Sequence, residues 1–489
     1  MPDTGCRKRE APRGTAGRGL TAVRPRRLDG SGGLTPRDAW GITARCHACP
    51  RCNPPAPDMA SVETPPQLRA WQWRIFWLLW TAYASYYLCR VNFAVAQPLI
   101  LREFPGWSNA QVGSIPSTYA LFYAVGQVIN GTLCARWGAR HMMTVALLIA
   151  AATNALFAFA STYPQMLILW ALNGYAQSAG WSLLVQTLAN WTTSARRGTV
   201  LGLISTCYTV GNVVSWLLAG MLCETLGWRA AFWVPSLILV PVAAVFFLFL
   251  RNSPEEAGLP PVRDDVGDRE RAGASGGGGV ADELSLPAIL RLTFTNRVLW
   301  ILAVGFFCMN AVRYAFMNWS IQYMADFQGR SIKGSALTAV VIPLVGSVGA
   351  IAAGWVSDHW FGRRRAPVCA LMQAGLAAVC VGFTWVPRGE WVLATVLLGL
   401  AGFLIYGPDM LMSGAATVDI SHPRAASIAT GFTMCLGALG SIFSGAGVGW
   451  LKDLTRGDWN LVFYALAGLV LVAAAFMVSI WNARPKGAK

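Results

Sequence analysis

The amino-acid sequence predicts an all-α protein that crosses a membrane twelve times, in two pseudo-symmetric halves of six helices. Of its 489 residues, 55% are hydrophobic and 13% are charged, and the mean hydropathy of +0.45 excludes an ordinary water-soluble domain. Apolar runs of about 20 residues, the length that spans a bilayer, occur six times, then stop, then occur six times again. An arginine lies at similar depth in the first run and in the seventh, which indicates that the halves are related.

The expected spans divide the chain into its parts. In order, they are residues 73–97, 109–134, 141–160, 164–187, 198–223, 229–250, 298–324, 333–357, 366–386, 390–415, 425–450 and 459–481. The first six form an N-terminal bundle, residues 59–250, and the last six a C-terminal bundle, residues 298–481. Residues 251–297 between them are charged and contain four consecutive glycines, which is typical of a flexible linker. A short tail, residues 482–489, ends the chain.

Residues 1–58 differ in composition from the rest of the chain. They are rich in Arg, Gly and Pro and show no apolar periodicity, so we expect them to be disordered. Residues 46–52 offer four potential metal ligands, but no second Cys/His cluster follows to complete a site, and we expect no metal centre. Met59 opens a shorter sequence ahead of the first span, and our hypothesis is that translation starts there.

The net charge of +16 comes from basic residues at the loops, the linker and both ends of the chain, so we expect a lipid bilayer and no nucleic acid as partner. Apart from residues 1–58 and the one arginine deep in each of the first and seventh spans, 19 Lys and Arg lie on the side of the linker and 7 on the opposite side. Because cytoplasmic segments carry the excess of basic residues, we expect the linker and both termini in the cytoplasm, and the chain in the plasma membrane.

Arg90 and Arg313 are the most informative residues of the sequence. Each lies near the middle of a span, where a cationic side chain is costly and normally faces a water-filled cavity or a partner. Neither span contains Asp or Glu, so we expect both arginines to serve the function. The alternative is a structural carboxylate, from another span, that neutralises them.

Polar residues accompany each arginine on its helix. Tyr83, Tyr87 and Arg90 follow one another at spacings of four and three, which places them on one helical face. Asn310 lies one turn before Arg313 and is a candidate for substrate contact or coupling. A guanidinium matches phosphate or carboxylate bidentately and stays charged at every physiological pH. Two such groups that converge on one cavity suit a doubly charged phosphate better than a neutral sugar.

The loops after the second and the eighth span repeat one pattern. The later loop joins Asp358, a tight glycine turn and Arg363, Arg364 and Arg365, whereas the earlier loop has Ala135 in place of the acid. In a chain of six plus six spans, this repeat resembles the major facilitator superfamily, which implies two bundles that rock about a central cavity. We expect a cytoplasmic latch, in which Asp358 pairs with a neighbouring helix and the arginines stay among lipid headgroups. The alternative is that the basic clusters only anchor their loops.

Five longer strings carry a more specific resemblance. They are residues 86–94 in the first span, 173–181 in the fourth, 252–261 after the sixth, 313–319 in the seventh and 402–408 in the tenth. Together they resemble the organophosphate:phosphate antiporter family, which includes glycerol-3-phosphate and hexose-6-phosphate transporters. The resemblance implies that Arg90 and Arg313 hold the phosphate of the substrate, and that Tyr83, Tyr87 and Tyr406 line the cavity.

The chain departs from that family in several places. Val91 follows Arg90 where a basic residue is familiar, Gln127 stands at a lysine position of the second span, and Tyr208 stands at the histidine position of the glycerol-3-phosphate type. Asp409 adds a carboxylate within the membrane. We expect Asp409 to pair with an arginine, to bind a cationic group of the ligand or to carry a proton, unless it faces water near a helix break.

We therefore expect a secondary transporter that moves a phosphorylated organic anion by alternating access, in exchange for inorganic phosphate. Either anion would satisfy both arginines, whereas an empty site would leave two cations facing each other and resist closure. Two alternatives stay open, a sugar-phosphate sensor of the same fold and a proton-coupled transporter of another organic anion. The sequence shows no nucleotide-binding loop, catalytic triad or metal pair, so we expect no enzyme activity and no cofactor. The family implies a monomer.

Overall fold

Helices make up all the regular secondary structure of the described residues, which are 66–262, 291–421 and 426–483 in a computed structural model. These residues belong to one compact unit, Thr64–Lys489. The expected tail, its Cys/His segment at residues 46–52, Met59 and most of the linker lie outside the described residues.

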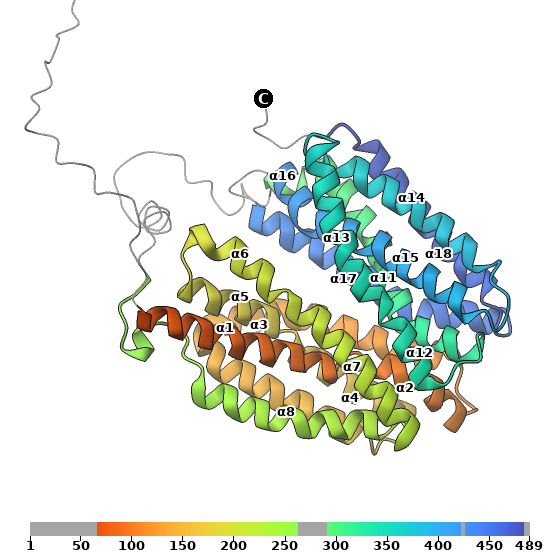
Figure 1. The fold of residues 1–489 in the computed structure, drawn as a ribbon, viewed down its shortest axis with the longest axis horizontal. Helices are drawn as coiled ribbons and strands as arrows, with labels where there is room; N and C mark the ends of the chain where they lie inside the picture. Colours follow the sequence, from red (N-terminus) through yellow and green to blue (C-terminus); the bar gives the residue numbers. More distant parts are fainter. Residues whose placement is uncertain (1–65, 263–290, 422–425, 484–489) are drawn as a thin grey trace, which may run out of the picture. The chain divides into compact units, whose positions relative to one another are not determined.

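The N-terminal half contains eight helices that correspond to the first six expected spans (Figure 1). In chain order these are α1 (Pro66–Leu88), α2 (Asn92–Glu103), α3 (Asn109–Phe157), α4 (Tyr163–Gln177), α5 (Gly180–Trp191), α6 (Ser194–Ile204), α7 (Thr206–Thr225) and α8 (Ala230–Phe249), followed by the 3-10 turn η1 (Glu255–Ala257). Three spans are interrupted: α1 and α2 form the first, α4 and α5 the fourth, and α6 and α7 the fifth. The second and third spans are the two parts of α3, which are separated at Gly138, a glycine with φ 71°.

The C-terminal half contains the other six spans. Its elements are α11 (Arg297–Asp326), α12 (Ile332–Ala339), α13 (Val341–His359), α14 (Arg365–Phe383), α15 (Trp391–Met410), the π-turn η2 (Leu411–Ala415), α16 (Ala416–Ile420), α17 (Ala426–Leu454) and α18 (Asn460–Ser479). Here α12 and α13 form the eighth span, and α15, η2 and α16 form the tenth. The expectation of an all-helical, twelve-span chain is confirmed.

Nine helical runs of the described residues are long and apolar enough to cross a membrane. The expected first, second and fourth spans are not among these nine. The fourth span is interrupted, so neither α4, with 15 residues, nor α5, with 12 residues, is long enough by itself. The first and second spans carry polar side chains such as Arg74, Tyr83 and Tyr119, which lower their mean hydropathy. Polar residues within such spans mark a functional site by default.

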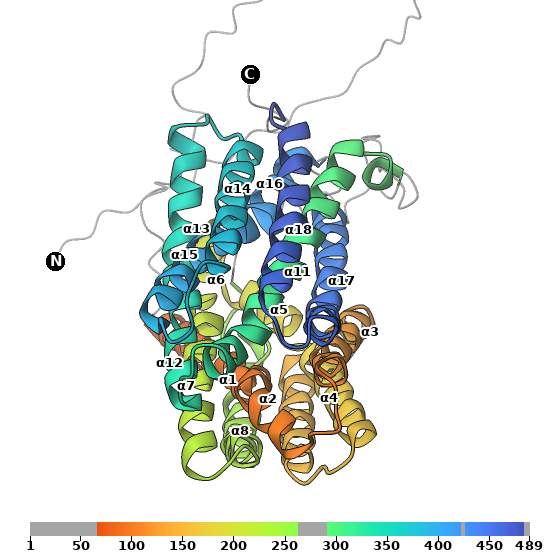
Figure 2. The same ribbon diagram turned by 90° about the vertical axis from the view of Figure 1, so that its right-hand side faces the viewer.

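The two halves touch where α17 packs on α3 and α12 packs on α7, as Figures 1 and 2 show. Gly113 of α3 faces Gly445 of α17, where a Cβ on either glycine would collide with the backbone of the other. Close backbone approach at small residues is a usual way to pack membrane helices. The crossing brings the start of α3 against the end of α17, and we call this end of the molecule the far end. The opposite end, where α8 leads into the linker, is the linker end.

Hydrogen bonds reinforce the far end. The carboxylate of Asp453, at the end of α17, accepts from the backbone N–H groups of Asn109 and Ala110 at 3.0 and 2.8 Å and so caps the start of α3. Gln97 of α2 donates to Gln322 of α11 at 2.7 Å. Among the described residues, every side-chain hydrogen bond that joins the halves involves residues 97–117 of the N-terminal half. The structure therefore represents a state in which the far end is closed.

Candidate functional site

Arg90 lies at a break in the first span rather than inside a continuous helix. The helix α1 ends at Leu88 and α2 begins at Asn92, which leaves the carbonyl of Cys89 outside any helical hydrogen bond. Three amide side chains donate to this carbonyl, those of Asn154 at 3.2 Å, Asn173 at 2.7 Å and Gln177 at 3.2 Å. Because an unsatisfied carbonyl in a membrane costs several kcal/mol, these donors make the break stable.

The guanidinium of Arg90 is surrounded by neutral groups. Its Nε donates to Oε1 of Gln177 at 3.0 Å, and its Cζ lies 4.8 Å from the ring centre of Tyr87 and 5.1 Å from that of Tyr123. The rings of Tyr83 and Tyr119 follow at 6.0 Å. Arg90 makes no ion pair with any described residue, and its buried Nη2 has no hydrogen-bond partner among them. Aromatic rings stabilise the cation without neutralising it.

Arg313 has a different environment, in the middle of the unbroken helix α11. Its Nη1 donates to Oδ1 of Asp409 at 2.8 Å, and the side chains of the two residues are 21% and 17% exposed. The rings of Tyr406 and Tyr314 lie 5.2 and 5.4 Å from its Cζ, and its buried Nε has no partner among the described residues. The alternative that a carboxylate from another span neutralises the arginines therefore holds for Arg313 and not for Arg90.

Asp409 is held at an irregular place in the tenth span. It directly follows Pro408 near the end of α15, and its backbone carbonyl accepts from Ser413 Oγ, at 2.6 Å, inside the π-turn η2. A π-turn inside a membrane helix changes the direction of the side chains around it, and such turns are frequent at functional sites. Asp409 is therefore fixed by Arg313 on one side and by an unusual backbone on the other.

The surroundings of the two arginines belong to one site. Tyr208 of α7 lies within electrostatic range of Arg313 and Asp409, although it belongs to the other half. Tyr87 lies within electrostatic range of both Arg90 and Arg313. Arg90, Arg313 and the expected tyrosines Tyr83, Tyr87, Tyr208 and Tyr406 are thus brought together.

Two of the other candidates lie to the side of this site. Asn310 is buried against α17, where its Nδ2 leaves no room for a Cβ on Gly437. Gln127 is half-buried on α3, one helical turn beyond Tyr123. Gln127 therefore extends the row of polar residues that Tyr119 and Tyr123 begin, whereas Asn310 contributes to helix packing.

Asp358, which we expect to belong to a latch, makes an ion pair at the linker end of the C-terminal half. Asp358 accepts from Nη1 of Arg365, the first residue of α14, at 2.7 Å. Arg365 is only 16% exposed and also reaches Asp419 at 3.4 Å. Its guanidinium thus joins the ends of α13, α14 and α16. Arg364 donates to Asn482 at 3.4 Å, and Arg363 occupies the turn with φ 65°.

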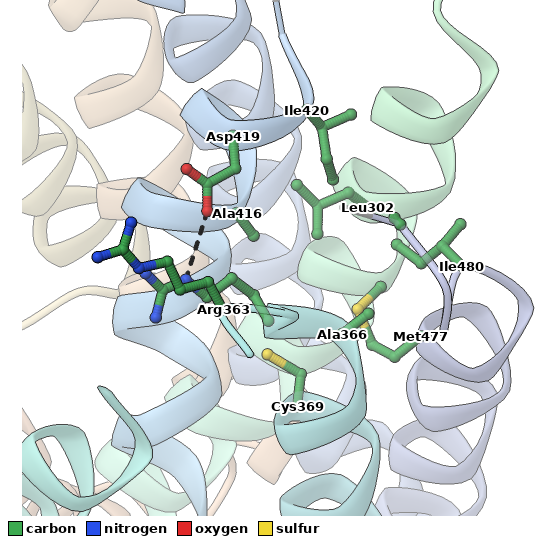
Figure 3. Close-up of a pocket in the computed structure, with 11 residues that line it drawn as sticks. Leu302, Arg363, Ala366, Cys369, Ala416, Asp419, Ile420, Met477 and Ile480 are labelled. Carbon is green, nitrogen blue, oxygen red and sulfur yellow. Dashed lines mark hydrogen bonds and ion pairs between the residues drawn. The ribbon is translucent and has the colours of Figure 1, made fainter. Parts of the chain in front are cut away.

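A small hollow lies beside this latch. Figure 3 shows Arg363 and Asp419 on one of its sides and the apolar Leu302, Met477 and Ile480 on another. Neither Arg90 nor Arg313 lines it. The hollow is thus a feature of the C-terminal latch and not of the site that contains the two arginines.

In the N-terminal half, the loop after the second span is held by residues at the start of the linker. The side chain of Asn252 accepts from the backbone N–H of Arg140 at 2.9 Å and donates to Glu256 at 2.9 Å. Its backbone carbonyl accepts from Asn190 at 3.1 Å. The string at residues 252–261 therefore fastens the loop in which Ala135 replaces the acid, and it does so by amide hydrogen bonds instead of an ion pair.

Sequence reasoning missed three residues next to Arg90 and one at the far end. Gln177, Tyr119 and Tyr123 contact the guanidinium, and Asp453 joins the halves. A signal existed for the first three, because an amide in the middle of the fourth span and tyrosines at i and i+4 in the second are unusual polar residues within a membrane. Asp453 lies at the end of a span, where an acid is ordinary, and no sequence pattern distinguishes it.

The sequence model of the Major Facilitator Superfamily matches residues 79–445. A probable hexose phosphate transport protein of Chlamydia pneumoniae is 30% identical over 428 residues, which cover 86% of this chain and 93% of that protein. The glycerol-3-phosphate transporter of Bacillus subtilis is 29% identical and covers 84% and 92%, and the membrane sensor protein UhpC of Salmonella typhimurium is 29% identical and covers 86% and 94%.

Among solved structures, the fold is similar to that of a bacterial homolog of the human lysosomal transporter Spinster, in an inward-facing and unoccupied conformation. The TM-score is 0.65 at 16% sequence identity, and the match covers 86% of this chain and 96% of that one. At this identity the match supports the fold and its arrangement of helices, and no substrate.

Proposed function

The chain belongs to the major facilitator superfamily and, within it, to the organophosphate:phosphate antiporter family, and we propose that it carries a phosphorylated organic anion across a membrane in exchange for inorganic phosphate. It belongs to a family of transporters and is not an enzyme. The relatives named for hexose phosphate and glycerol-3-phosphate supply the substrate class, a phosphate ester of a small polyol.

One observation carries the proposal: two guanidiniums in one site each keep an unused edge. Arg90 uses Nε for Gln177 and leaves its terminal nitrogens, and Arg313 uses Nη1 for Asp409 and leaves Nε. A buried donor without a partner costs about 1–3 kcal/mol, and more when it is charged. A phosphate that accepts from both edges relieves this cost and bridges the two halves.

The tyrosines complete the site. The rings of Tyr83 and Tyr87 lie beside Arg90, and that of Tyr406 lies beside Arg313. Their hydroxyl groups donate and accept hydrogen bonds, which suits a polyol attached to the phosphate. The phosphate group thus provides the affinity through the arginines, and the tyrosines select the organic part.

In alternating access the site opens first to one side of the membrane and then to the other, so the end that is closed in this structure must open. At the far end, the bond between Gln97 and Gln322 and the cap that Asp453 places on α3 must break for the site to open there. At the linker end, the ion pairs of Arg365 with Asp358 and Asp419 keep α13, α14 and α16 together while the C-terminal half moves as a unit, and Arg363 and Arg364 lie in the turn between α13 and α14. We propose that the linker end lies in the cytoplasm, because basic residues are concentrated on that side. We also propose a location in the plasma membrane and, as the family implies, a monomer.

A sensor that binds a sugar phosphate without moving it is the second candidate function. The relative named a membrane sensor protein matches this chain over almost its whole length, so fold and family do not separate the two roles. Counterflow separates them, since only a transporter moves labelled anion across a sealed membrane. A proton-coupled transporter of another anion is a third candidate, which the carboxylate of Asp409 favours.

The test is release of labelled inorganic phosphate from proteoliposomes that contain the full chain. Outside, phosphate, glycerol-3-phosphate, glucose-6-phosphate and a carboxylic acid without phosphate are compared. We expect the three phosphates to accelerate release, and Arg90→Lys or Arg313→Lys to abolish it, since lysine lacks the bidentate fork. Binding of these phosphates without accelerated release would favour the sensor. Neither binding nor release of any phosphate by folded protein would refute the proposal.

A further inference from the structure

Asp409 changes the charge of the empty site, and this has a consequence for transport. Two guanidiniums without a carboxylate would leave two positive charges in the unloaded site. With the ion pair of Arg313 and Asp409, at 2.8 Å, only the charge of Arg90 remains. When the site closes, an ion pair whose two charges cancel costs less free energy in a low-dielectric environment than an isolated buried charge.

The charge that remains on Arg90 is itself well distributed. Four tyrosine rings surround the guanidinium, and Gln177 holds its Nε. Each ring face attracts the cation without adding a charge of its own. The N-terminal half of the site thus tolerates its single cation when no anion is present, and the C-terminal half has no net charge at all.

Binding of phosphate changes the sign of the net charge in the site but not its magnitude, so charge does not favour closure of the loaded carrier over the empty one. A doubly charged phosphate adds two negative charges to a site with one positive charge, so the loaded site is left with one negative charge. The empty site carries one charge of the opposite sign. In a site without Asp409, the same ligand would bring the charge from two positive to zero, and only the loaded carrier would close easily. A carrier that must bind an anion before each change of conformation therefore needs a site without a carboxylate equivalent to Asp409.

We propose that Asp409 is a resident counter-anion of Arg313 that lets the empty carrier change conformation, so that the chain moves its phosphorylated anion down a gradient without a counter-anion as well as by exchange. This rests on the proposed function, which supplies the anion. It departs from the strict exchange that two unpaired arginines would enforce.

The contacts of Asp409 fit this role better than that of a ligand-binding group. Its Oδ1 is already bound to Arg313. The titratable side chains close enough to interact with it are Arg313 on α11, Tyr208 on α7 and Tyr406 on its own helix α15. Arg313 is the one cation among these three, so neither tyrosine competes with it for the carboxylate. The carboxylate is therefore committed to neutralising Arg313 unless an arriving phosphate displaces it.

The experiment compares two release rates in the same proteoliposomes, loaded with labelled inorganic phosphate. One rate is measured into a buffer without any phosphate, with the membrane potential clamped, and the other into a buffer with unlabelled phosphate. For the unaltered chain we expect the first rate to lie within about tenfold of the second. For Asp409→Asn we expect the rate of release without counter-anion, relative to the exchange rate in the same proteoliposomes, to fall by at least about tenfold, because the empty site then holds two charges. Glu390→Gln, an exposed carboxylate at the start of the same helix, is the matched control and is expected to change neither rate.

The unaltered chain alone can overturn the inference, so a misfolded variant does not block the test. Exchange without measurable release into phosphate-free buffer overturns it and leaves the proposed function intact. Release that Asp409→Asn does not reduce also overturns it, since another group then permits closure. Release that follows an imposed pH difference assigns a transported proton to Asp409 and overturns the fixed counter-anion. Absence of both rates, together with absence of phosphate binding, refutes the proposed function and with it this inference.

Discussion

Arg90 and Arg313 occupy corresponding spans of the two halves, yet they differ in backbone, partners and charge. Arg90 follows a helix break and is surrounded by Gln177 and four tyrosine rings. Arg313 lies within an unbroken helix and is paired with Asp409. The comparison teaches that pseudo-symmetry of the fold does not extend to the chemistry of the site. The N-terminal half keeps a cation available for the ligand, whereas the C-terminal half has neutralised its own.

The largest expected effect of this difference concerns stability. Arg313→Gln leaves Asp409 buried without a partner, and we expect the free energy of unfolding to fall by roughly 3 kcal/mol. Arg90→Gln leaves no carboxylate behind, so its cost should be clearly smaller. Thermal unfolding of the two variants in the same detergent compares them directly.

The control is the double variant Arg313→Gln with Asp409→Asn, which removes both members of the pair. Removing a buried pair altogether costs far less than removing one member, so the double variant should recover most of the stability lost by Arg313→Gln. Equal losses for Arg90→Gln and Arg313→Gln, with no recovery in the double variant, would show that the pair is not what distinguishes the halves.

A second variant makes the two halves alike. Gln177→Glu gives Arg90 a carboxylate of its own, in the position from which the amide now accepts its Nε–H at 3.0 Å. An anion must then compete at both arginines, and we expect phosphate affinity to fall by at least about tenfold, which corresponds to about 1.4 kcal/mol. Gln177→Leu adds no charge, but it removes the hydrogen bond to Arg90 together with the donation of Gln177 to the carbonyl of Cys89, and it should weaken binding by less than Gln177→Glu. If both variants weaken binding equally, positioning of Arg90 matters and its free charge does not.

The positions of the helices were predictable from sequence, because a bilayer fixes the length of an apolar span. The helical segments agree with the expected spans 298–324, 366–386 and 459–481 to within a few residues. The break at Arg90 was not predictable. Residues 89–91 contain no Gly or Pro, whereas α15 continues through Pro408. The break depends on amides from other helices that donate to the carbonyl of Cys89, and such tertiary hydrogen bonds leave no local pattern.

The site was predictable in its residue types and only partly in its contacts. A cation inside an apolar span is visible in one dimension, so Arg90 and Arg313 could be chosen at once. Asp409 could be recognised as a carboxylate within a span, but its partner lies 96 residues away, and sequence alone does not say which arginine it meets. Gln177 was missed although an amide within a span is unusual, because the sequence does not say that Arg90 is its neighbour in space.

The linker-end loops offer the same comparison at a smaller energy. The N-terminal loop is held by the side chain of Asn252, which bonds to Arg140 and Glu256, and the C-terminal loop by Arg365. We expect Asn252→Ala to destabilise its loop by about 1–2 kcal/mol, the range for a lost capping side chain. Hydrogen exchange of the backbone N–H of Arg140 should then accelerate by about tenfold, with Ser253→Ala as the neighbouring control. Unchanged exchange at Arg140 would mean that the linker does not fasten this loop.

The smallest effect is expected at the acid that the sequence pattern makes most conspicuous. Asp358 is 47% exposed, and Arg365 keeps Asp419 when Asp358 is lost. Since exposed ion pairs contribute about 0–1 kcal/mol, Asp358→Asn should change the free energy of unfolding by no more than about 0.5 kcal/mol. Arg365→Gln removes the ion pairs to both acids and should cost more, about 1–2 kcal/mol, for a mostly buried guanidinium with charged partners. Thermal unfolding of the two variants ranks them, and a larger loss for Asp358→Asn would make the acid, rather than the arginine that joins three helices, the centre of the latch.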